Sequence, residues 1–324
     1  MRIVVIGAGA MGGLYGGRLK LAGEDVVLVD SARAIVDAIR QNGLKLGGVG
    51  GDQVVHLPAT DDPEQAGEAF DLALIFTDTN ATAAAAKLAK RLLKPAGFAL
   101  TLQNGIGNVE ALCAELGAAR VVAGLSYHSG ASSAPGVSMH TNRGPTWIGE
   151  LDGKRTPRLE ALTRAFAAAG LEPALVDNVM AHVWAKFVHN CAINPIAAVS
   201  GLRVGEIARN PAADALQSKV IEEILAVIAA KGVRLPDGDP TATIKAFCKR
   251  KFNRPSMQQH LEAGRRTEID ALNGALVRLG QELGVPTPYN QALVWLVKAR
   301  EAHMRQALHG PPLDYAALEA EAAR

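Results

Sequence analysis

A glycine-rich loop between an apolar strand and a helix constrains the fold of this chain most. Ile3-Val4-Val5-Ile6 is a short β-branched run, the pattern of a buried parallel strand. Gly7-Ala8-Gly9-Ala10-Met11-Gly12 follows it directly, and a helix is expected from Leu14 to Leu21. In such a loop the first glycine permits a tight turn, the second lets backbone approach a pyrophosphate, and the third lets the helix pack on the strand. The phosphates of a dinucleotide would lie at the N-terminus of that helix, where N–H groups and the helix dipole attract anions.

A second apolar run, from Val26 to Val29, ends in Asp30. A carboxylate at the end of the second strand of such a unit accepts a hydrogen bond from an adenosine ribose 2′-hydroxyl and repels a 2′-phosphate. Asp30 is therefore a candidate cofactor contact. The same aspartate has an alternative interpretation as the N-cap of a helix that begins near Ala32.

Alternating strand and helix patterns continue along the N-terminal half. The expected elements are a hairpin at 43–57, a strand at 71–76, a helix at 82–93, a turn at 95–97 and a strand at 98–102. The last of these strands runs into Asn104. Ligands bind after the carboxyl ends of parallel strands, so Asn104 is a candidate site residue, although Asn-Gly is also a common turn.

The β patterns between 121 and 148 predict an antiparallel extension of the sheet, completed by a helix at 157–169 and a strand at 173–176. We therefore expect an α/β protein with two domains. Residues 1–177 would form a Rossmann-type doubly wound parallel sheet that binds the dinucleotide. Residues 178–324, where helical patterns predominate, would form an all-α substrate and dimerisation domain. A chain of 324 residues with 48% hydrophobic content is long enough for two cores.

Composition excludes several other classes of function. A net charge of +2 gives no reason to expect a nucleic-acid partner. Cys113, Cys191 and Cys248 are odd in number and lack metal-ligand spacing, so we expect reduced thiols and no metal site. No charged leader with a cleavage site precedes the first strand, and no apolar run reaches membrane-spanning length. These features predict a cytoplasmic protein without membrane association.

The stretch from Trp184 to Pro195 carries polar residues at helical spacing. Lys186, Asn190 and Asn194 are each four residues apart, so they lie along one stripe of a helix whose other positions are mostly apolar. One potential proton donor and two amides suit a small oxygen-rich molecule. The alternative is a lysine and two asparagines that close an interdomain contact. We expect this helix to end at Pro195, and another long helix to run from Asn210 to Ala230.

A helix-start pattern appears again at Ser256, with Gln259 three residues later as in a capping box. The same helix N-terminus could receive a substrate carboxylate, with help from the Ser256 hydroxyl. We expect the helix to continue through residues 264–274, where Glu268 would be either a solvent-facing residue or a partner for substrate hydroxyls.

With these motifs in order, the chain resembles the ketopantoate reductase (2-dehydropantoate 2-reductase) family along nearly its whole length. The resemblance rests on the glycine loop, Asn104-Gly105, Trp184-x-Lys186 with both asparagines and Pro195, and Ser256-Met257 with the later Gly264 to Gly274 segment. It implies an oxidoreductase with NAD(P)H as cofactor and a small 2-oxo acid as substrate. It also implies Lys186 as the general acid. The implied substrate contacts are Asn104, Asn190, Asn194, Ser256 and Glu268. Asn104 and Glu268 are also implied to lie near the cofactor.

Three positions depart from the family pattern. Ser31 stands where members that use the phosphorylated cofactor commonly have an arginine, and Arg33 is the nearest cation. Asp78 stands where the family usually has a lysine near the cofactor, and His260 replaces an expected aspartate. The carboxylates of Asp30 and Asp78 disfavour a 2′-phosphate by charge repulsion. The sequence therefore favours NADH over NADPH.

The predicted reaction is hydride transfer to C2 of a 2-oxo acid while Lys186 donates a proton to the developing alkoxide. Reduction of 2-dehydropantoate to pantoate in pantothenate biosynthesis is the expected activity. One alternative is an NAD-dependent dehydrogenase of another branched or aromatic 2-hydroxy acid. Another is a dinucleotide-binding sensor without catalysis. The helical domain also makes a homodimer plausible.

Overall fold

The structure is a computed structural model and describes residues 1–323, so Arg324, the last residue of the predicted helical domain, lies outside the described residues. The chain divides into two compact units, Met1–Lys186 and Phe187–Arg324. The first unit is an α/β structure and the second is built from helices. This division confirms the predicted fold class.

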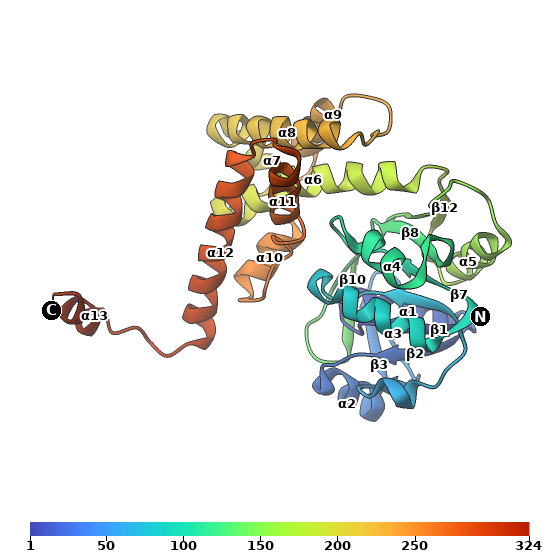
Figure 1. The fold of residues 1–324 in the computed structure, drawn as a ribbon. Helices are drawn as coiled ribbons and strands as arrows, with labels where there is room; N and C mark the ends of the chain where they lie inside the picture. Colours follow the sequence, from blue (N-terminus) through green and yellow to red (C-terminus); the bar gives the residue numbers. More distant parts are fainter. Residues whose placement is uncertain (324) are drawn as a thin grey trace. The chain divides into compact units, whose positions relative to one another are not determined.

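The first unit is organised around an eight-stranded sheet with the strand order β12-β11-β8-β7-β6-β1-β2-β5 (Figure 1). Every neighbouring pair from β8 to β5 is parallel, β11 is antiparallel to β8, and β12 is parallel to β11. The strands are β1 (Arg2–Ile6), β2 (Asp25–Val29), β5 (Ala59–Thr60), β6 (Phe70–Ile75), β7 (Leu93–Thr101), β8 (Val121–Ser126), β11 (Thr146–Glu150) and β12 (Pro173–Leu175).

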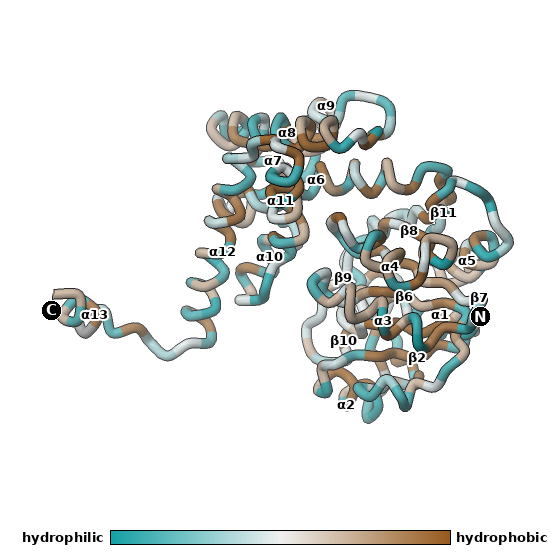
Figure 2. Tube along the Cα trace, in the orientation of Figure 1, coloured by the Kyte–Doolittle hydropathy of each residue, from teal (hydrophilic) through white to brown (hydrophobic). Residues whose placement is uncertain are grey.

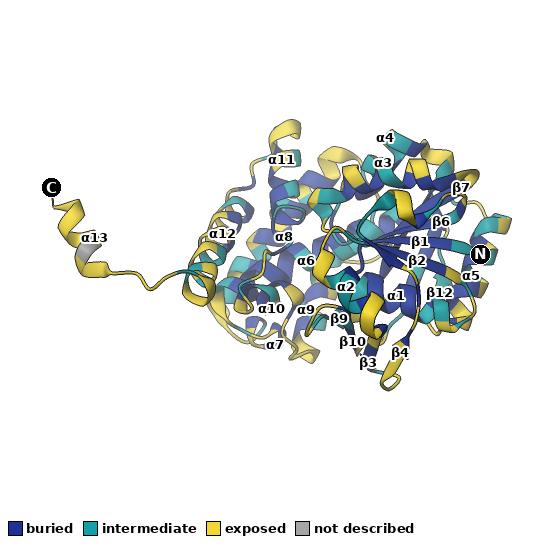
Figure 3. Ribbon diagram, turned by 90° about the horizontal axis from the view of Figure 1, so that it is seen from below, coloured by how far each residue is buried: buried dark blue, intermediate teal, exposed yellow. Residues whose placement is uncertain are grey.

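Helices cover both faces of this sheet because successive side chains of a strand point to opposite sides. Ile3 and Val5 belong to one apolar cluster, whereas Val4 and Ile6 belong to another. The first cluster includes side chains of α1 (Ala10–Leu21), α2 (Arg33–Asn42) and α5 (Pro157–Ala168). The second includes side chains of α3 (Thr82–Leu92) and α4 (Asn108–Leu116). Figure 2 draws β2 and β6 largely in the brown of hydrophobic residues, and Figure 3 draws β1, β2 and β6 as buried.

A smaller sheet has the strand order β4-β3-β10-β9. Its strands are β3 (Leu44–Gly48), β4 (Gln53–Val55), β9 (Ser129–Ala131) and β10 (Val137–Asn142). The antiparallel β3–β4 pair confirms the predicted hairpin. The prediction that all strands between 121 and 148 extend the main sheet is wrong for β9 and β10. β10 instead pairs in parallel with β3, and the Ser138 hydroxyl donates a 2.5 Å hydrogen bond to the Ala10 carbonyl at the start of α1.

The expected turn at Pro95-Ala96-Gly97 is a local irregularity inside β7. Leu93 pairs with Phe70 and Phe98 pairs with Leu72, so the register of β7 against β6 shifts between these points. Proline lacks a donor for the ladder, and the shift lets the strand pass it without a break. Three short 3₁₀ helices complete the connections, η1 (Pro63–Ala66), η2 (Thr79–Ala81) and η3 (Ala118–Arg120).

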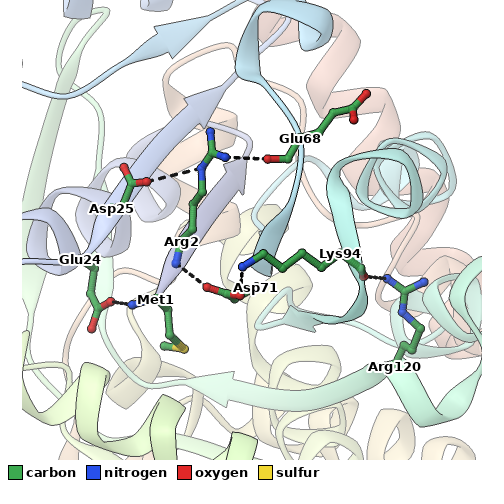
Figure 4. A network of polar contacts seen from close by, with 8 residues as sticks. All are labelled: Met1, Arg2, Glu24, Asp25, Glu68, Asp71, Lys94 and Arg120. Carbon is green, nitrogen blue, oxygen red and sulfur yellow. Dashed lines mark hydrogen bonds and ion pairs between the residues drawn. The ribbon is translucent and has the colours of Figure 1, made fainter.

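Polar contacts tie the sheet together at the amino ends of its strands (Figure 4). The Arg2 amide donates to Asp71 Oδ2 at 2.8 Å, and Lys94 Nζ donates to Asp71 Oδ1 at 2.7 Å. Arg2 also pairs with Asp25, and the amino terminus pairs with Glu24. Burial raises the pKa of Asp71, but these donors outweigh it and the pKa lies below its usual value. The opposite edge of the sheet, at the carboxyl ends, carries the candidate site.

The second unit is helical throughout its regular structure. Helix α6 (Val179–Ser200) begins in the first unit and includes the first residues of the second. The helices that follow are α7 (Val204–Ile207), α8 (Pro211–Lys231), α9 (Pro240–Arg250), α10 (Ser256–Glu262), α11 (Asn273–Leu283), α12 (Pro288–His309) and α13 (Tyr315–Ala322). Across residues 1–323, none of the helices combines the length and the apolar character needed to cross a membrane.

The prediction that the first helix ends at Pro195 is wrong, because α6 continues through this proline to Ser200. Pro195 has no N–H group, so it cannot donate to the carbonyl of Cys191 one turn earlier. The buried side chain of Asn273 replaces that donor, with Nδ2 at 3.1 Å from the Cys191 oxygen. Gln217 Nε2 similarly donates to the next carbonyl, that of Ala192, at 3.1 Å. Side chains from α11 and α8 thus stabilise a helix that the sequence would break.

Candidate functional site

Four predicted site elements follow the carboxyl ends of adjacent parallel strands. The glycine loop follows β1, Asp30 follows β2, Asp78 follows β6 and Asn104 follows β7. Backbone hydrogen bonds hold the first three strand ends together, from the Gly7 amide to the Val29 carbonyl and from the Phe76 amide to the Ile6 carbonyl, both at 2.8 Å. This edge of an open parallel sheet is where ligands bind in doubly wound folds.

The glycines of the loop meet the geometric demands of a phosphate cradle. Gly7 has a φ of +100°, and a β-carbon on it would lie 2.6 Å from the Phe76 backbone. A β-carbon on Gly12 would lie 1.7 Å from the Gly7 carbonyl oxygen. A β-carbon on Gly9 would meet no heavy atom within 4 Å, so the space beside this residue is open. Gly9 is the N-cap of α1 and brings no capping side chain, as expected where an anion binds the first amides of a helix. The chain's own residues therefore fit a dinucleotide pyrophosphate.

Asp30 stands between the glycine loop and α2. Its Oδ2 accepts a 2.6 Å hydrogen bond from the Ala8 amide, and its Oδ1 accepts one of 2.8 Å from the Ala32 amide. Helix α2 begins at Arg33 with Ala32 as the N-cap, so the alternative prediction of Asp30 as the N-cap is wrong. The aspartate is two residues too early to cap the helix and instead accepts a hydrogen bond from the amide of the capping residue. Its position after β2 is the one at which an acidic residue contacts an adenosine ribose.

Asp78 is exposed and caps the 3₁₀ helix η2. Its Oδ1 accepts hydrogen bonds from the Asn80 amide at 2.9 Å and from Asn80 Nδ2 at 2.6 Å. The carboxylate therefore has a local structural role, while its negative charge remains at the exposed edge of the sheet.

Asn104 lies in a bend between β7 and α4 that hydrogen bonds hold in place. Gln103 Nε2 donates to the Thr77 carbonyl at 2.8 Å, which joins the loop after β7 to the loop after β6. Asn108 Nδ2 donates to the Asn104 carbonyl at 3.0 Å, and Thr82 Oγ1 donates to Asn108 Oδ1 at 2.9 Å. The Asn104 backbone is thus fixed beside the other strand ends. A small hollow borders this loop, lined by Gln103, Gly105 and Asn108 among others.

Lys186 reaches the carboxyl end of β8, the next parallel strand beyond β7. Its Nζ donates a 2.6 Å hydrogen bond to the carbonyl oxygen of Ser126, the last residue of β8. The ammonium also lies over the ring of Tyr127, 5.6 Å from the ring centroid. Lys186 is half-buried. The first unit therefore brings the proposed proton donor to the same sheet edge as the glycine loop and Asn104.

Buried hydroxyls support the strand end that receives Lys186. Tyr15 of α1 contacts Ser126 Oγ at 2.8 Å and Thr146 Oγ1 at 2.6 Å. Burial raises the pKa of Tyr15 to about 12, although both hydroxyl contacts oppose the change. Ser126 Oγ also accepts a 3.0 Å hydrogen bond from the His128 amide. Tyr15 therefore stays a neutral phenol whose hydroxyl links the side chains of Ser126 on β8 and Thr146 on β11.

The remaining predicted residues lie in the second unit. Asn190 is half-buried and Asn194 is 6% exposed, and both lie on α6 at the predicted spacing from Lys186. Ser256 is the exposed first residue of α10. Glu268 is half-buried, and its carbonyl accepts hydrogen bonds from the Ala271 and Leu272 amides, both at 3.0 Å.

Two local predictions around these residues are wrong. The capping box at Ser256 does not form, because Pro255 is the N-cap of α10 and Gln259 Nε2 donates to the Arg254 carbonyl at 2.7 Å. The helix also does not continue through residues 264–274. It ends at Glu262, Gly264 takes a φ of +65°, and the chain turns until α11 begins at Asn273. Glu268 therefore lies in a turn between two helices.

The residues that hold the proposed functional groups in place were not predicted from the sequence. They are Tyr15 of α1, Gln103, Ser126 and Tyr127. Gln103 lies shortly after β7, Ser126 ends β8, Tyr127 follows it, and Tyr15 lies in the second turn of α1. Only the strand order shows that these four residues lie close to one sheet edge.

Two family models match the chain, one over its N-terminal part and one over its C-terminal part. The model for "Ketopantoate reductase PanE/ApbA" matches residues 3–153, and the model for "Ketopantoate reductase PanE/ApbA C terminal" matches residues 178–301. The 2-dehydropantoate 2-reductase of Pyrococcus horikoshii is 33% identical over 302 residues, which cover 93% of this chain and 98% of the relative. The 2-dehydropantoate 2-reductase of Archaeoglobus fulgidus is 32% identical over 305 residues, with coverage of 93% and 98%.

Solved structures agree with these relatives. The PanE/ApbA family ketopantoate reductase of Ralstonia eutropha JMP134 superposes with a TM-score of 0.85 at 35% identity and covers 94% of this chain and 100% of its own. A D-mandelate dehydrogenase solved with NADH and anilino(oxo)acetate also gives a TM-score of 0.85, at 25% identity and coverage of 94% and 99%. With two family models matched along most of its length and relatives above 30% identity, this chain belongs to the ketopantoate reductase family.

Proposed function

We propose that this protein reduces a 2-oxo acid to a 2-hydroxy acid with a nicotinamide cofactor. Residues 1–177 would bind the dinucleotide, and residues 178–324 would supply substrate contacts and a homodimer interface. The observation that carries the proposal is the position of Lys186. Its ammonium donates to the Ser126 carbonyl at the carboxyl end of β8. The adjacent parallel strand, β7, ends beside Asn104-Gly105 and the small hollow that borders this loop.

The glycine loop supports the cofactor assignment. Gly9 leaves open space for phosphates, whereas Gly7 and Gly12 permit the close approach of backbone that the turn requires. The amides of Ala8, Ala10 and Met11 lie in the same loop at the start of α1. The cofactor would supply the hydride for C2 of the substrate. Asp30 would accept from the adenosine ribose, and the exposed charge of Asp78 would add to its repulsion of a 2′-phosphate. With Ser31 in place of a cation, these carboxylates favour NADH over NADPH.

Lys186 would act as the general acid. As hydride reaches the carbonyl carbon, negative charge develops on the oxygen, and the ammonium donates the proton that completes the hydroxyl group. A positioned acid contributes roughly 10²–10⁴ in rate. Asn190 and Asn194, one and two turns further along α6, would orient the substrate by hydrogen bonds that add no charge. Asn104, Ser256 and Glu268 would complete the substrate contacts, with Asn104 and Glu268 also near the cofactor.

Two substrates follow from these features. We propose 2-dehydropantoate, reduced to pantoate in pantothenate biosynthesis, because relatives above 30% identity carry that activity in their names. The second candidate is another branched or aromatic 2-oxo acid. It is supported by the similarity to a D-mandelate dehydrogenase solved with NADH, and by Asp30 at the end of β2.

The test is steady-state oxidation of NADH and NADPH, in parallel, with 2-dehydropantoate and with branched and aromatic 2-oxo acids. Turnover of 2-dehydropantoate supports the first substrate, and NADH-linked turnover of only another oxo acid supports the second. Tight NADH binding by calorimetry without turnover of any 2-oxo acid would overturn the proposal in favour of a dinucleotide-binding sensor.

The role of Lys186 has its own test. Lys186→Ala is expected to lower kcat by roughly 10²–10⁴ while the Kd for NADH stays near that of the wild type. Ser200, also on α6, offers a matched control, because Ser200→Ala removes a polar group from the far end of the same helix. If single-turnover hydride transfer in Lys186→Ala equals that of the wild type, Lys186 is not the acid.

A further inference from the structure

Tyr127 is an aromatic residue that no sequence motif singles out and that lies directly against the proposed proton donor. Tyr127 is 41% exposed as a residue, and Lys186 Nζ lies over its ring at 5.6 Å from the ring centroid. The backbone of the preceding residue, Ser126, accepts the 2.6 Å hydrogen bond from the same ammonium. Two consecutive residues therefore offer Lys186 a carbonyl oxygen and the face of an aromatic ring.

Both groups favour the charged form of the lysine. A carbonyl oxygen accepts a stronger hydrogen bond from an ammonium than from a neutral amine. The negative face of an aromatic ring attracts a cation and gives little to the neutral amine. We propose that Tyr127 is a positioning residue that, together with the Ser126 carbonyl, holds the Lys186 ammonium charged and aimed for proton donation. This inference rests on the proposed function, in which Lys186 is the acid.

The Tyr127 ring is itself held in place. It packs edge-on against Trp147 of β11, with ring centroids 5.4 Å apart. Trp147 in turn packs against His182, with centroids 4.7 Å apart. His182 lies one turn before Lys186 on α6. The packed rings of Tyr127, Trp147 and His182 thus connect the end of β8, through β11, to α6, the helix that carries the lysine. Backbone contacts add to this order, since the Tyr127 amide donates to the Pro145 carbonyl at 2.9 Å.

The other titratable groups on the elements around Lys186 would keep their charge when Tyr127 is substituted. Burial lowers the pKa of His182 on α6 and of His128 after β8, so both imidazoles are neutral at neutral pH. Burial raises the pKa of the Tyr127 phenol, so this ring carries no charge. Glu150 at the end of β11 is ionised, but Arg158 pairs with it. Substituting Tyr127 therefore changes the ring face without removing a neighbouring charge.

The experiment uses the cofactor-free full chain, with its lysines reductively methylated with ¹³C and titrated by NMR. The Lys186 resonance is assigned by its loss in Lys186→Arg. In Tyr127→Leu the pKa of Lys186 is expected to fall by about 0.5 pH unit, the size expected for one exposed cation–π contact. Tyr127→Phe is the matched control, because it keeps the ring and should leave that pKa within about 0.2 pH unit. Tyr127→Trp should raise the pKa of Lys186, because an indole ring attracts a cation more strongly than a phenol ring does.

Activity gives a second readout on the substrate that the wild type turns over. The basic limb of the kcat/KM profile should also shift to lower pH in Tyr127→Leu, with Tyr127→Phe unchanged. If the pKa of Lys186 is the same in Tyr127→Leu, Tyr127→Phe and Tyr127→Trp, Tyr127 does not have the proposed role. If the NMR shift appears but Lys186→Ala retains the wild-type rate, the contact is real and the proposed function fails. The two failures are therefore distinguishable.

Discussion

The helix that carries Lys186, Asn190 and Asn194 depends on a side chain from α11, and this dependence can be measured. Asn273 is 0% exposed, and its Nδ2 donates to the Cys191 carbonyl at 3.1 Å and to Asn290 Oδ1 at 2.8 Å. In Asn273→Ala both acceptors lose this donor. Each buried acceptor left unsatisfied costs about 1–3 kcal/mol, so the free energy of unfolding should fall by about 2–6 kcal/mol.

A second substitution separates the energy of the hydrogen bond to the Cys191 carbonyl from the energy of side-chain packing around Asn273. Pro195→Ala restores an N–H group four residues after Cys191, where it can donate to the same carbonyl. In that background Asn273→Ala should cost about 1–3 kcal/mol less, because only Asn290 is left without its donor. Gln217→Ala is the matched control. Gln217 donates to the Ala192 carbonyl, whose helical donor is the amide of Ile196, so its cost should be the same in both backgrounds.

The assay is urea unfolding followed by far-UV circular dichroism, with stability compared only between variants of equal m-value. The double-mutant cycle gives the coupling between positions 195 and 273 directly. A coupling below about 0.5 kcal/mol would refute the argument, since the two positions would then act independently.

Three further predictions follow. Gly9→Ala should weaken NADH binding in calorimetry by roughly tenfold, or about 1.4 kcal/mol, without changing the melting temperature, because its β-carbon fills only open space. Gly12→Ala should lower the melting temperature, because its β-carbon would lie 1.7 Å from a carbonyl oxygen. Burial lowers the pKa of His128 and His140 in the folded chain, so the unfolded chain binds more protons below their usual pKa of 6.5. Stability should therefore fall as the pH drops below 6.5, and the melting temperature of His140→Gln should depend less on pH in this range. Asp30→Asn should narrow the preference for NADH over NADPH in parallel assays, because the repelling charge is lost. Unchanged kcat/KM ratios in that variant would count against Asp30 as the source of the preference.

Local patterns were sufficient to predict much of the first unit. Ile3 to Ile6 and Val26 to Val29 are buried apolar runs, and the glycine loop joins the first of them to α1. Short apolar runs punctuated by glycine define parallel strands without knowledge of their neighbours. Lys186, Asn190 and Asn194 could also be placed on one helix from spacing alone.

Several features that were not predicted depend on residues distant in sequence. The bond that carries α6 past Pro195 joins residues 82 positions apart, and the Lys186 contact to Ser126 joins residues 60 apart. The pairing of β10 with β3 likewise joins residues far apart in sequence, such as Val137 and Lys45. Propensity and periodicity describe short windows, so they cannot show which side chain will replace a missing amide or which carbonyl will receive an ammonium.

The proposed cofactor preference and the geometry of the glycine loop depend on the same carboxylate. Asp30 would repel a 2′-phosphate by its charge, and its two oxygens also accept hydrogen bonds from the Ala8 amide of the glycine loop and the Ala32 amide before α2. Charge-assisted hydrogen bonds of this kind are roughly twice as strong as neutral ones. Loss of Asp30 would therefore change the cofactor site and loosen the loop that binds the phosphates. A cation gained at the exposed Ser31 would leave both contacts in place, so this position offers the less disruptive route to use of a 2′-phosphorylated cofactor.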